Sequence, residues 1–192
     1  MTEYEARTRR FTRAEYDRMI ELGVLGEDEP IELIGGELMV AEPRGAPHYT
    51  AVVKTARALQ ALFGPAWYVR AEGPIGLDDE SEPEPDIAVV PGTPDDYSRA
   101  HPSRPALTVE VSDFTLALDR RHKGSLYARA GLEDYWIVNL GDRVVEVYRE
   151  PIADSAAPFG WRYAQRQVFD VSARVTPLAL PGAGVLVAQL LP

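Results

Sequence analysis

Two carboxylates stand inside short apolar runs, and this placement limits what the chain can fold into. Asp86 opens the apolar run of residues 85–90, and Glu110 lies within the run of residues 106–111. Short apolar runs rich in β-branched side chains are typical of buried strands. A charge in such a strand costs on the order of several kcal/mol unless it is paired or bound to a metal. The fold must therefore give each carboxylate a partner.

The composition is that of an ordinary globular protein. With 192 residues, 45% hydrophobic and 26% charged, we expect one domain spanning residues 1–192. The absence of cysteine excludes disulfides and thiolate metal sites. No apolar run approaches the roughly 20 residues of a membrane span, and the charged first ten residues lack the apolar core of an export signal. We therefore expect no membrane association and a cytoplasmic location.

The charge balance bears on possible partners. The net charge of −10 and the pI of about 4.8 argue against a broad, non-specific grip on DNA or RNA, because phosphate contacts drive such binding. A local basic cleft remains possible. Eighteen of the twenty basic residues are arginine, and only Lys54 and Lys123 are lysine. A lysine is thus more informative here than in most chains.

The pattern along the chain predicts mixed strands with helices on the sheet faces, which is an α/β or α+β fold. Thr12 and Glu15 have the spacing of a capping box at the start of a helix. Gly35-Gly36 predicts the turn of a hairpin over residues 31–40. The other predicted helices cover residues 48–63 and 119–130, and the other predicted strands cover residues 67–77, 85–90, 106–111, 134–140, 143–149 and 161–168.

Strand periodicity can bring the two carboxylates together. Alternation places Glu110 on one strand face with Thr108 and Ser112, and Asp86 on a face with Ala88. If the two strands are neighbours, Asp86 and Glu110 converge. Two carboxylates plus waters suit Mg²⁺ or Mn²⁺, which can activate water and stabilise a phosphoryl transition state. The alternative is that Asp86 caps a turn and Glu110 pairs with an arginine.

The two lysines differ in their predicted surroundings. Lys123 shares a helical stripe with Tyr127, so we expect its side chain to lean toward the sheet. The alternative is snorkelling, in which the stem packs and the ammonium reaches water. Lys54 shares its face with Thr50 and Arg57, and we expect it to be solvated.

Two further residues are candidates for the same site. Glu37 follows the Gly-Gly turn and could supply a third carboxylate, although a solvated hairpin residue is the alternative. His48 lies one turn before Val52 on the core-facing stripe of its helix. It could assist with water or phosphate, or it could be a satisfied histidine at a helix start.

The order of one carboxylate strand, a second carboxylate strand and then a lysine resembles the PD-(D/E)XK nuclease superfamily. Nearly the whole chain resembles one branch, the Uma-two family of restriction-endonuclease-like proteins. The resemblance is carried by Glu32-Leu33-Ile34-Gly35-Gly36-Glu37, His48 at a helix start, Glu84-Pro85-Asp86, Val109-Glu110-Val111-Ser112-Asp113, Asp119-Arg120, Lys123, Leu126-Tyr127-Ala128-Arg129-Ala130-Gly131, Tyr135-Trp136-Ile137-Val138 and Val144-Val145-Glu146-Val147-Tyr148.

This resemblance implies a restriction-endonuclease-like mixed central sheet flanked by helices. It also implies that Asp86 and Glu110 are metal ligands, that Glu37 is an acidic partner and that Lys123 is the catalytic lysine. The chain departs from the superfamily at Ser112, where a lysine normally stands two residues after the second acid. Lys123 would then act from a helix in place of that lysine.

The sequence-based hypothesis is an Mg²⁺- or Mn²⁺-dependent endonuclease that hydrolyses phosphodiester bonds in DNA. Arg120, Arg121 and Arg99 are candidates for phosphate contact, and a homodimer would let such an enzyme reach both strands. One rival is a non-catalytic binding or assembly module that keeps the fold, which the acidic charge and Ser112 favour. Another is a nuclease that needs a DNA-binding partner.

Overall fold

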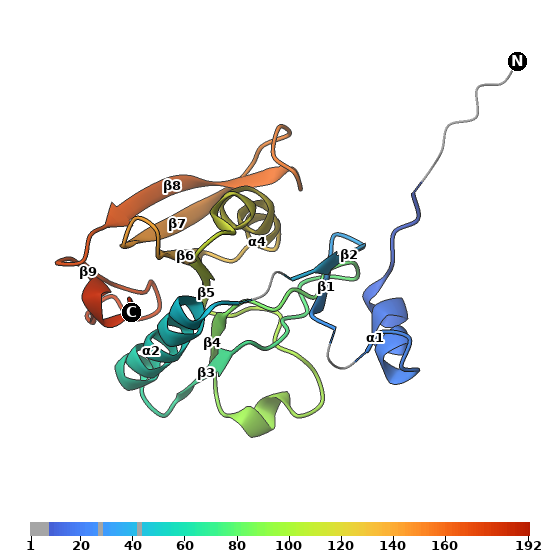
Figure 1. Cartoon of the computed structure of the whole chain (residues 1–192), viewed down its shortest axis with the longest axis horizontal. Helices are drawn as coiled ribbons and strands as arrows, with labels where there is room; N and C mark the ends of the chain where they lie inside the picture. Colours follow the sequence, from blue (N-terminus) through green and yellow to red (C-terminus); the bar gives the residue numbers. More distant parts are fainter. Residues whose placement is uncertain (1–7, 27–28, 42–43) are drawn as a thin grey trace, which may run out of the picture.

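A six-stranded mixed sheet forms the centre of the protein in the computed structural model, which describes residues 8–26, 29–41 and 44–192 (Figure 1). Its strands lie in the order β3-β4-β5-β6-β7-β8. Neighbouring strands are antiparallel except for β5 and β6, which are parallel. The strands are β3 (Trp67–Ala71), β4 (Ile87–Pro91), β5 (Leu107–Ser112), β6 (Asp134–Asn139), β7 (Val144–Ala153) and β8 (Trp161–Phe169).

The parallel pair requires a crossover, because two parallel strands cannot be joined by a tight turn. The crossover consists of the short helix α3 (Leu116–Leu118), the π-helical turn η2 (Asp119–Lys123) and α4 (Gly124–Arg129). Glycine suits position 124, because a Cβ there would lie 3.2 Å from the Asp119 carbonyl oxygen. The helical crossover begins at Leu116, three residues before the predicted helix of residues 119–130. It contains a π-turn, a feature frequent at functional sites.

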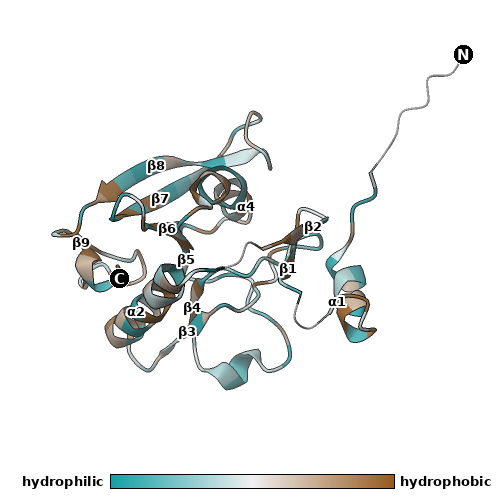
Figure 2. Cartoon of the chain, in the orientation of Figure 1, coloured by the Kyte–Doolittle hydropathy of each residue, from teal (hydrophilic) through white to brown (hydrophobic). Residues whose placement is uncertain are grey.

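Helices α2 and α4 lie on opposite faces of the sheet. The 18-residue α2 (Ala46–Phe63) packs on β3, β4 and β5, whereas α4 packs on β7 and β8. Leu107, Val109 and Val111 all enter the core on the α2 side, which confirms the predicted alternation in β5. Figure 2 shows the resulting contrast between apolar β5 and the mostly hydrophilic β8 at the sheet edge. The C-terminal β9 (Arg174–Val175), β10 (Val185–Leu186) and turn η3 (Val187–Gln189) complete this layer.

The N-terminal elements follow their sequence signals. Helix α1 (Arg13–Glu21) begins with the predicted capping box of Thr12 and Glu15. Strands β1 (Ile31–Ile34) and β2 (Glu37–Val40) form the predicted hairpin, with positive φ at both turn glycines. The hairpin joins the segment before β4 through the Glu82 N–H, which donates to the Leu33 carbonyl at 2.8 Å.

The strand predictions fail mainly at their ends. β3 stops at Ala71, six residues before the predicted end, because Glu72 takes a positive φ of 51°. After β3, the chain folds onto the segment before β4. The loop between β4 and β5 includes a 3₁₀ turn, η1 (Pro94–Tyr97). In the described ranges, no helix has the length and apolarity needed to cross a membrane.

A buried carboxylate on β7 organises the far half of the sheet. Glu146 is fully buried and accepts hydrogen bonds from Arg120, Tyr148, Asn139 and Arg166. Burial alone would raise the pKa of Glu146, but the hydrogen bonds from Arg120, Tyr148 and Asn139 lower the pKa to about 2. Glu146 therefore stabilises the fold in its ionised form.

We predict that Glu146→Gln destabilises the protein by about 1–3 kcal/mol at neutral pH, because charge-assisted hydrogen bonds are lost. The folded-state pKa lies below the unfolded value, so this stabilisation is present above pH 4.5 and is lost as the pH falls toward 2. Urea unfolding of both proteins from pH 7 to pH 2.5 should show the difference shrinking in acid. A difference that stays constant with pH would contradict this role.

Candidate functional site

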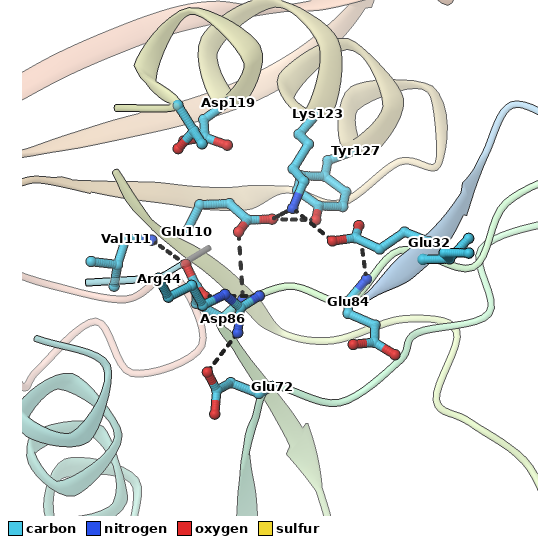
Figure 3. A network of polar contacts seen from close by, with 12 residues as sticks. Glu32, Arg44, Glu72, Glu84, Asp86, Glu110, Val111, Asp119, Lys123 and Tyr127 are labelled. Carbon is cyan, nitrogen blue, oxygen red and sulfur yellow. Dashed lines mark hydrogen bonds and ion pairs between the residues drawn. The ribbon is translucent and has the colours of Figure 1, made fainter. Parts of the chain in front are cut away.

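Glu110 lies on β5, and Asp86, the residue immediately before β4, lies beside it. Ile87 pairs with Val109 in the antiparallel register of β4 and β5, so Asp86, one residue earlier, comes opposite Glu110. The Asp86 N–H lies 3.4 Å from Glu110 Oε2, and the Val111 N–H donates to Asp86 Oδ2 at 2.7 Å (Figure 3). Both carboxylates are 3% exposed. The predicted convergence of the two strands is thus present.

Lys123 points from the crossover helix to the same place. Its Nζ lies 3.1 Å from Glu110 Oε1 and 3.5 Å from Glu32 Oε1, and the residue is 7% exposed (Figure 3). One helical turn later, the Tyr127 hydroxyl donates to the same Glu110 Oε1 at 2.6 Å. Lys123 therefore turns toward the sheet rather than snorkelling to water.

Burial and neighbouring charges shift the pKa values of the two carboxylates in opposite directions. Burial raises the pKa of Glu110 to about 8, although the Lys123 ammonium works in the other direction. Burial also works to raise the pKa of Asp86, but contacts with His48, the Val111 N–H and Arg44 hold it below its ordinary value. Burial would lower the pKa of Lys123, yet the surrounding carboxylates, Glu110 first, raise it. Lys123 is thus held as an ammonium.

These side chains line a pocket of about 220 Å³. Its described lining contains five acids, Glu32, Asp86, Glu110, Asp113 and Asp119, and the cations Arg44 and Lys123. Asp86 Oδ1 is buried without a hydrogen-bond donor among the described residues, with Arg44 at 3.5 Å as an ion pair. No group of three or more histidine, aspartate or glutamate side chains within residues 8–26, 29–41 and 44–192 is arranged to hold a metal ion. Two carboxylates with one free oxygen still fit an ion such as Mg²⁺, which keeps several waters.

His48 and Arg44 approach Asp86 from the start of α2. His48 lies in the first turn of α2, 8% exposed, and its Nε2 is 3.2 Å from Asp86 Oδ2. Arg44 also pairs with Glu72, whose Oε1 lies 2.5 Å from the guanidinium. The Pro/Gly-rich connector of residues 42–47 held no signal for Arg44, and residues 42 and 43 lie outside the described ranges.

The structure brings Glu32, not Glu37, to the pocket. Glu37 is exposed at the turn end of the hairpin, opposite Ile34, and does not line the pocket as the described residues form it. Glu32 is 5% exposed, and its Oε2 accepts the Glu84 N–H at 3.2 Å. A signal for Glu32 existed, because it interrupts the apolar run of residues 31–34 as Glu110 interrupts its own strand.

The three arginines proposed for phosphate contact lie elsewhere. Arg120 is bound to Glu146 and, with Arg121, lines a second pocket beside β7 and β8. Arg99 is exposed in the loop between β4 and β5. In the part of the chain that the structure describes, none of the three lines the pocket of Asp86. The sequence alone could not reveal that Arg120 is bound to Glu146.

Asp119 lines the pocket, although its only place in the sequence pattern is in the family resemblance, without a role at the site. It is 3% exposed and comes from the same turn η2 as Lys123 (Figure 3). Its Oδ2 accepts from the Thr115 hydroxyl at 2.6 Å. Burial raises its pKa, against the influence of Lys123.

The expectation of a solvated Lys54 is wrong, because Lys54 is half-buried and donates to the Leu191 carbonyl.

We predict that Lys123→Met destabilises the fold by about 3–5 kcal/mol, because it leaves buried Glu110 and Glu32 without a cation. The chain's only other lysine provides a matched control, since Lys54→Met removes one half-buried hydrogen bond and should cost about 1 kcal/mol. Urea unfolding measures both values. Adding Glu110→Gln to Lys123→Met should recover part of the loss, and equal costs for the two lysine variants would contradict the assignment.

Comparisons with known proteins agree with this fold. The family described as "Putative restriction endonuclease" (Uma2) matches residues 13–188. A solved structure described as a putative nuclease of DUF820 from Anabaena variabilis shares 18% sequence identity, with a TM-score of 0.63 over 90% of this chain and 96% of that chain. No curated protein matches the chain. The match over most of its length shows that the chain belongs to the Uma2 family of restriction-endonuclease-like proteins.

Proposed function

We propose that this protein is a divalent-metal-dependent endonuclease that hydrolyses phosphodiester bonds in DNA. The observation that supports this most is the convergence of three side chains into one pocket: Asp86 from the residue before β4, Glu110 from β5 and Lys123 from the crossover. Two acids and a lysine at one point match the chemistry of phosphodiester hydrolysis, in which charge must be stabilised at the phosphate. Family membership supports the same reaction class.

Asp86 and Glu110 are the proposed ligands for Mg²⁺ or Mn²⁺. Asp86 Oδ1 has no hydrogen-bond donor among the described residues, and Glu110 Oε2 accepts only the long contact from the Asp86 N–H at 3.4 Å, because Val111 holds Asp86 Oδ2 and Tyr127 holds Glu110 Oε1. A bound ion would supply positive charge that activates water and stabilises the phosphoryl transition state. The hydrogen bonds from Val111 and Tyr127 fix the orientation of both carboxylates before any ion binds.

Lys123 is the proposed source of fixed positive charge from the protein. It lies at the position where its ammonium balances Glu110 and Glu32, and it can also neutralise charge that develops on the phosphate. Ser112, which stands where the superfamily places its lysine, is buried and offers no cation. The crossover helix thus supplies the cation that β5 lacks.

Three neighbours have supporting roles in this proposal. His48 holds Asp86 Oδ2, so it is a positioning residue for that carboxylate. Glu32 takes the acidic-partner role that the family resemblance assigned to Glu37, because it binds Lys123 from the hairpin. Arg44, partly exposed at the pocket, is the candidate for phosphate contact, because it lines the pocket whereas Arg99, Arg120 and Arg121 do not.

The main rival is a metal-binding or assembly module that keeps the fold without catalysis. The acidic lining of the pocket favours it, because five carboxylates repel a phosphate backbone until cations offset them. Calorimetry with Mn²⁺ and a cleavage assay together separate the two. Metal binding without cleavage of any nucleic acid would favour the module.

We predict that the wild-type protein cleaves plasmid DNA or short duplexes with Mg²⁺ or Mn²⁺, and that Asp86→Ala and Glu110→Ala each lower the rate at least about 100-fold. Glu37→Ala is the matched control, since this exposed carboxylate lies outside the pocket and its loss should leave the rate unchanged. The readout is a gel assay at low salt and high enzyme concentration. The proposal fails if the wild type shows no cleavage or if Asp86→Ala cleaves equally well.

A further inference from the structure

The mouth of the pocket is apolar although its floor is charged. Phe114 is 91% exposed and Val40 is 71% exposed, the two largest values for large hydrophobic side chains in the described ranges. Both line the pocket that holds Asp86 and Glu110, although they come from segments far apart in the sequence. A single exposed apolar side chain is ordinary on a protein surface. Two at one pocket mouth indicate a surface that contacts a ligand.

The backbone beneath Phe114 is fixed rather than loose. The next residue, Thr115, donates from its hydroxyl to Asp119 Oδ2 at 2.6 Å. The Thr115 carbonyl accepts the N–H groups of Leu118 and Asp119 at 2.8 and 3.0 Å. Val40 is held opposite Ile31 in the hairpin. The ring of Phe114 is therefore presented to solvent from an anchored turn.

The paired charges of the lining leave few free cations for a nucleic-acid backbone, whether single-stranded or duplex. Lys123 is engaged by Glu110 and Glu32, and Arg44 is engaged by Glu72 and Asp86. Among the lining residues that the structure describes, both arginine and lysine side chains are thus already paired with carboxylates. Phosphate contacts contribute to the binding of duplexes and of single strands alike. An exposed aromatic ring instead offers stacking, which every unpaired base can accept.

We propose that this site takes an unpaired strand, with Phe114 stacked on a nucleobase beside the scissile phosphate and Val40 as the apolar wall of the same subsite. This inference rests on the proposed nuclease function and narrows its substrate to single-stranded DNA, flaps and frayed ends. In an intact duplex, the base faces are covered by their neighbours, so Phe114 cannot reach them. Stacking also supplies affinity where the acidic protein cannot rely on phosphate contacts.

The test measures binding of a fluorescent short single strand and of the matching duplex to the 192-residue protein, with Ca²⁺ present as the divalent ion. We expect the wild type to prefer the single strand, and Phe114→Ala to weaken that binding by about 5- to 100-fold, the range for loss of one stacked base. Phe114→Trp should retain it. The control Val168→Ala, which alters an exposed residue on β8 outside this pocket, should bind as the wild type does.

Three results would overturn the inference. The first is a Phe114→Ala protein that binds the single strand as tightly as the wild type, and the second is a wild type that prefers the duplex. The third is sedimentation showing that the wild type self-associates and Phe114→Ala does not, because Phe114 would then be a contact between copies of the chain. If the wild type still cleaves DNA in any of these cases, only this inference falls. A wild type that neither binds nor cleaves nucleic acid overturns the proposed function as well.

Discussion

The contact of Glu110 with Lys123 and Tyr127 is the interaction on which the site depends. A single carboxylate oxygen receives the Lys123 ammonium at 3.1 Å and the Tyr127 hydroxyl at 2.6 Å, four residues apart on one helix. Without these partners, the buried Glu110 carboxyl group would have neither a cation nor a hydrogen-bond donor at Oε1, which costs on the order of several kcal/mol when the group is ionised. The contact therefore fixes the crossover helix over the strand at one rotation and leaves Glu110 Oε2 facing Asp86.

One face of the sheet packs the apolar core, and the other holds the carboxylates of the candidate site. The α2 face is an apolar core built from alternating strand residues, as its members Val109 and Trp136 illustrate. The opposite face is apolar farther along the sheet but holds the carboxylates where β4 begins and β5 ends. Elements from the N-terminal third, the hairpin and the start of α2, then cover this point with Glu32 and His48. The pocket thus combines side chains from distant parts of the sequence on a rigid strand pair.

Local patterns were enough to predict the centre of the site. The period-2 alternation of β5 and the apolar runs around Asp86 and Glu110 required the two acids to find partners, and the helical stripe turned Lys123 inward. Each of these signals is contained within one element. The capping box at Thr12 and the Gly-Gly turn were predictable for the same reason.

The rest depended on how the elements pack against one another. Glu32 and Glu37 lie on the same small hairpin, and only its docking against the segment before β4 decides that Glu32 reaches Lys123. Arg120 forms an ion pair with Glu146, which is 26 positions away in the sequence. Arg44 comes from a connector without periodicity. Charged residues with distant partners therefore carry little information until the fold is known.

The most direct measurement is anomalous diffraction from a crystal of the protein soaked in Mn²⁺. A peak within bonding distance of both Asp86 and Glu110, with the Lys123 ammonium beside it, is the expected result. It should disappear in Glu110→Ala crystals treated in the same way. A fully soaked crystal with no ion at these carboxylates, or with the ion bound only elsewhere, would contradict the assignment of this pocket as a metal-dependent active site.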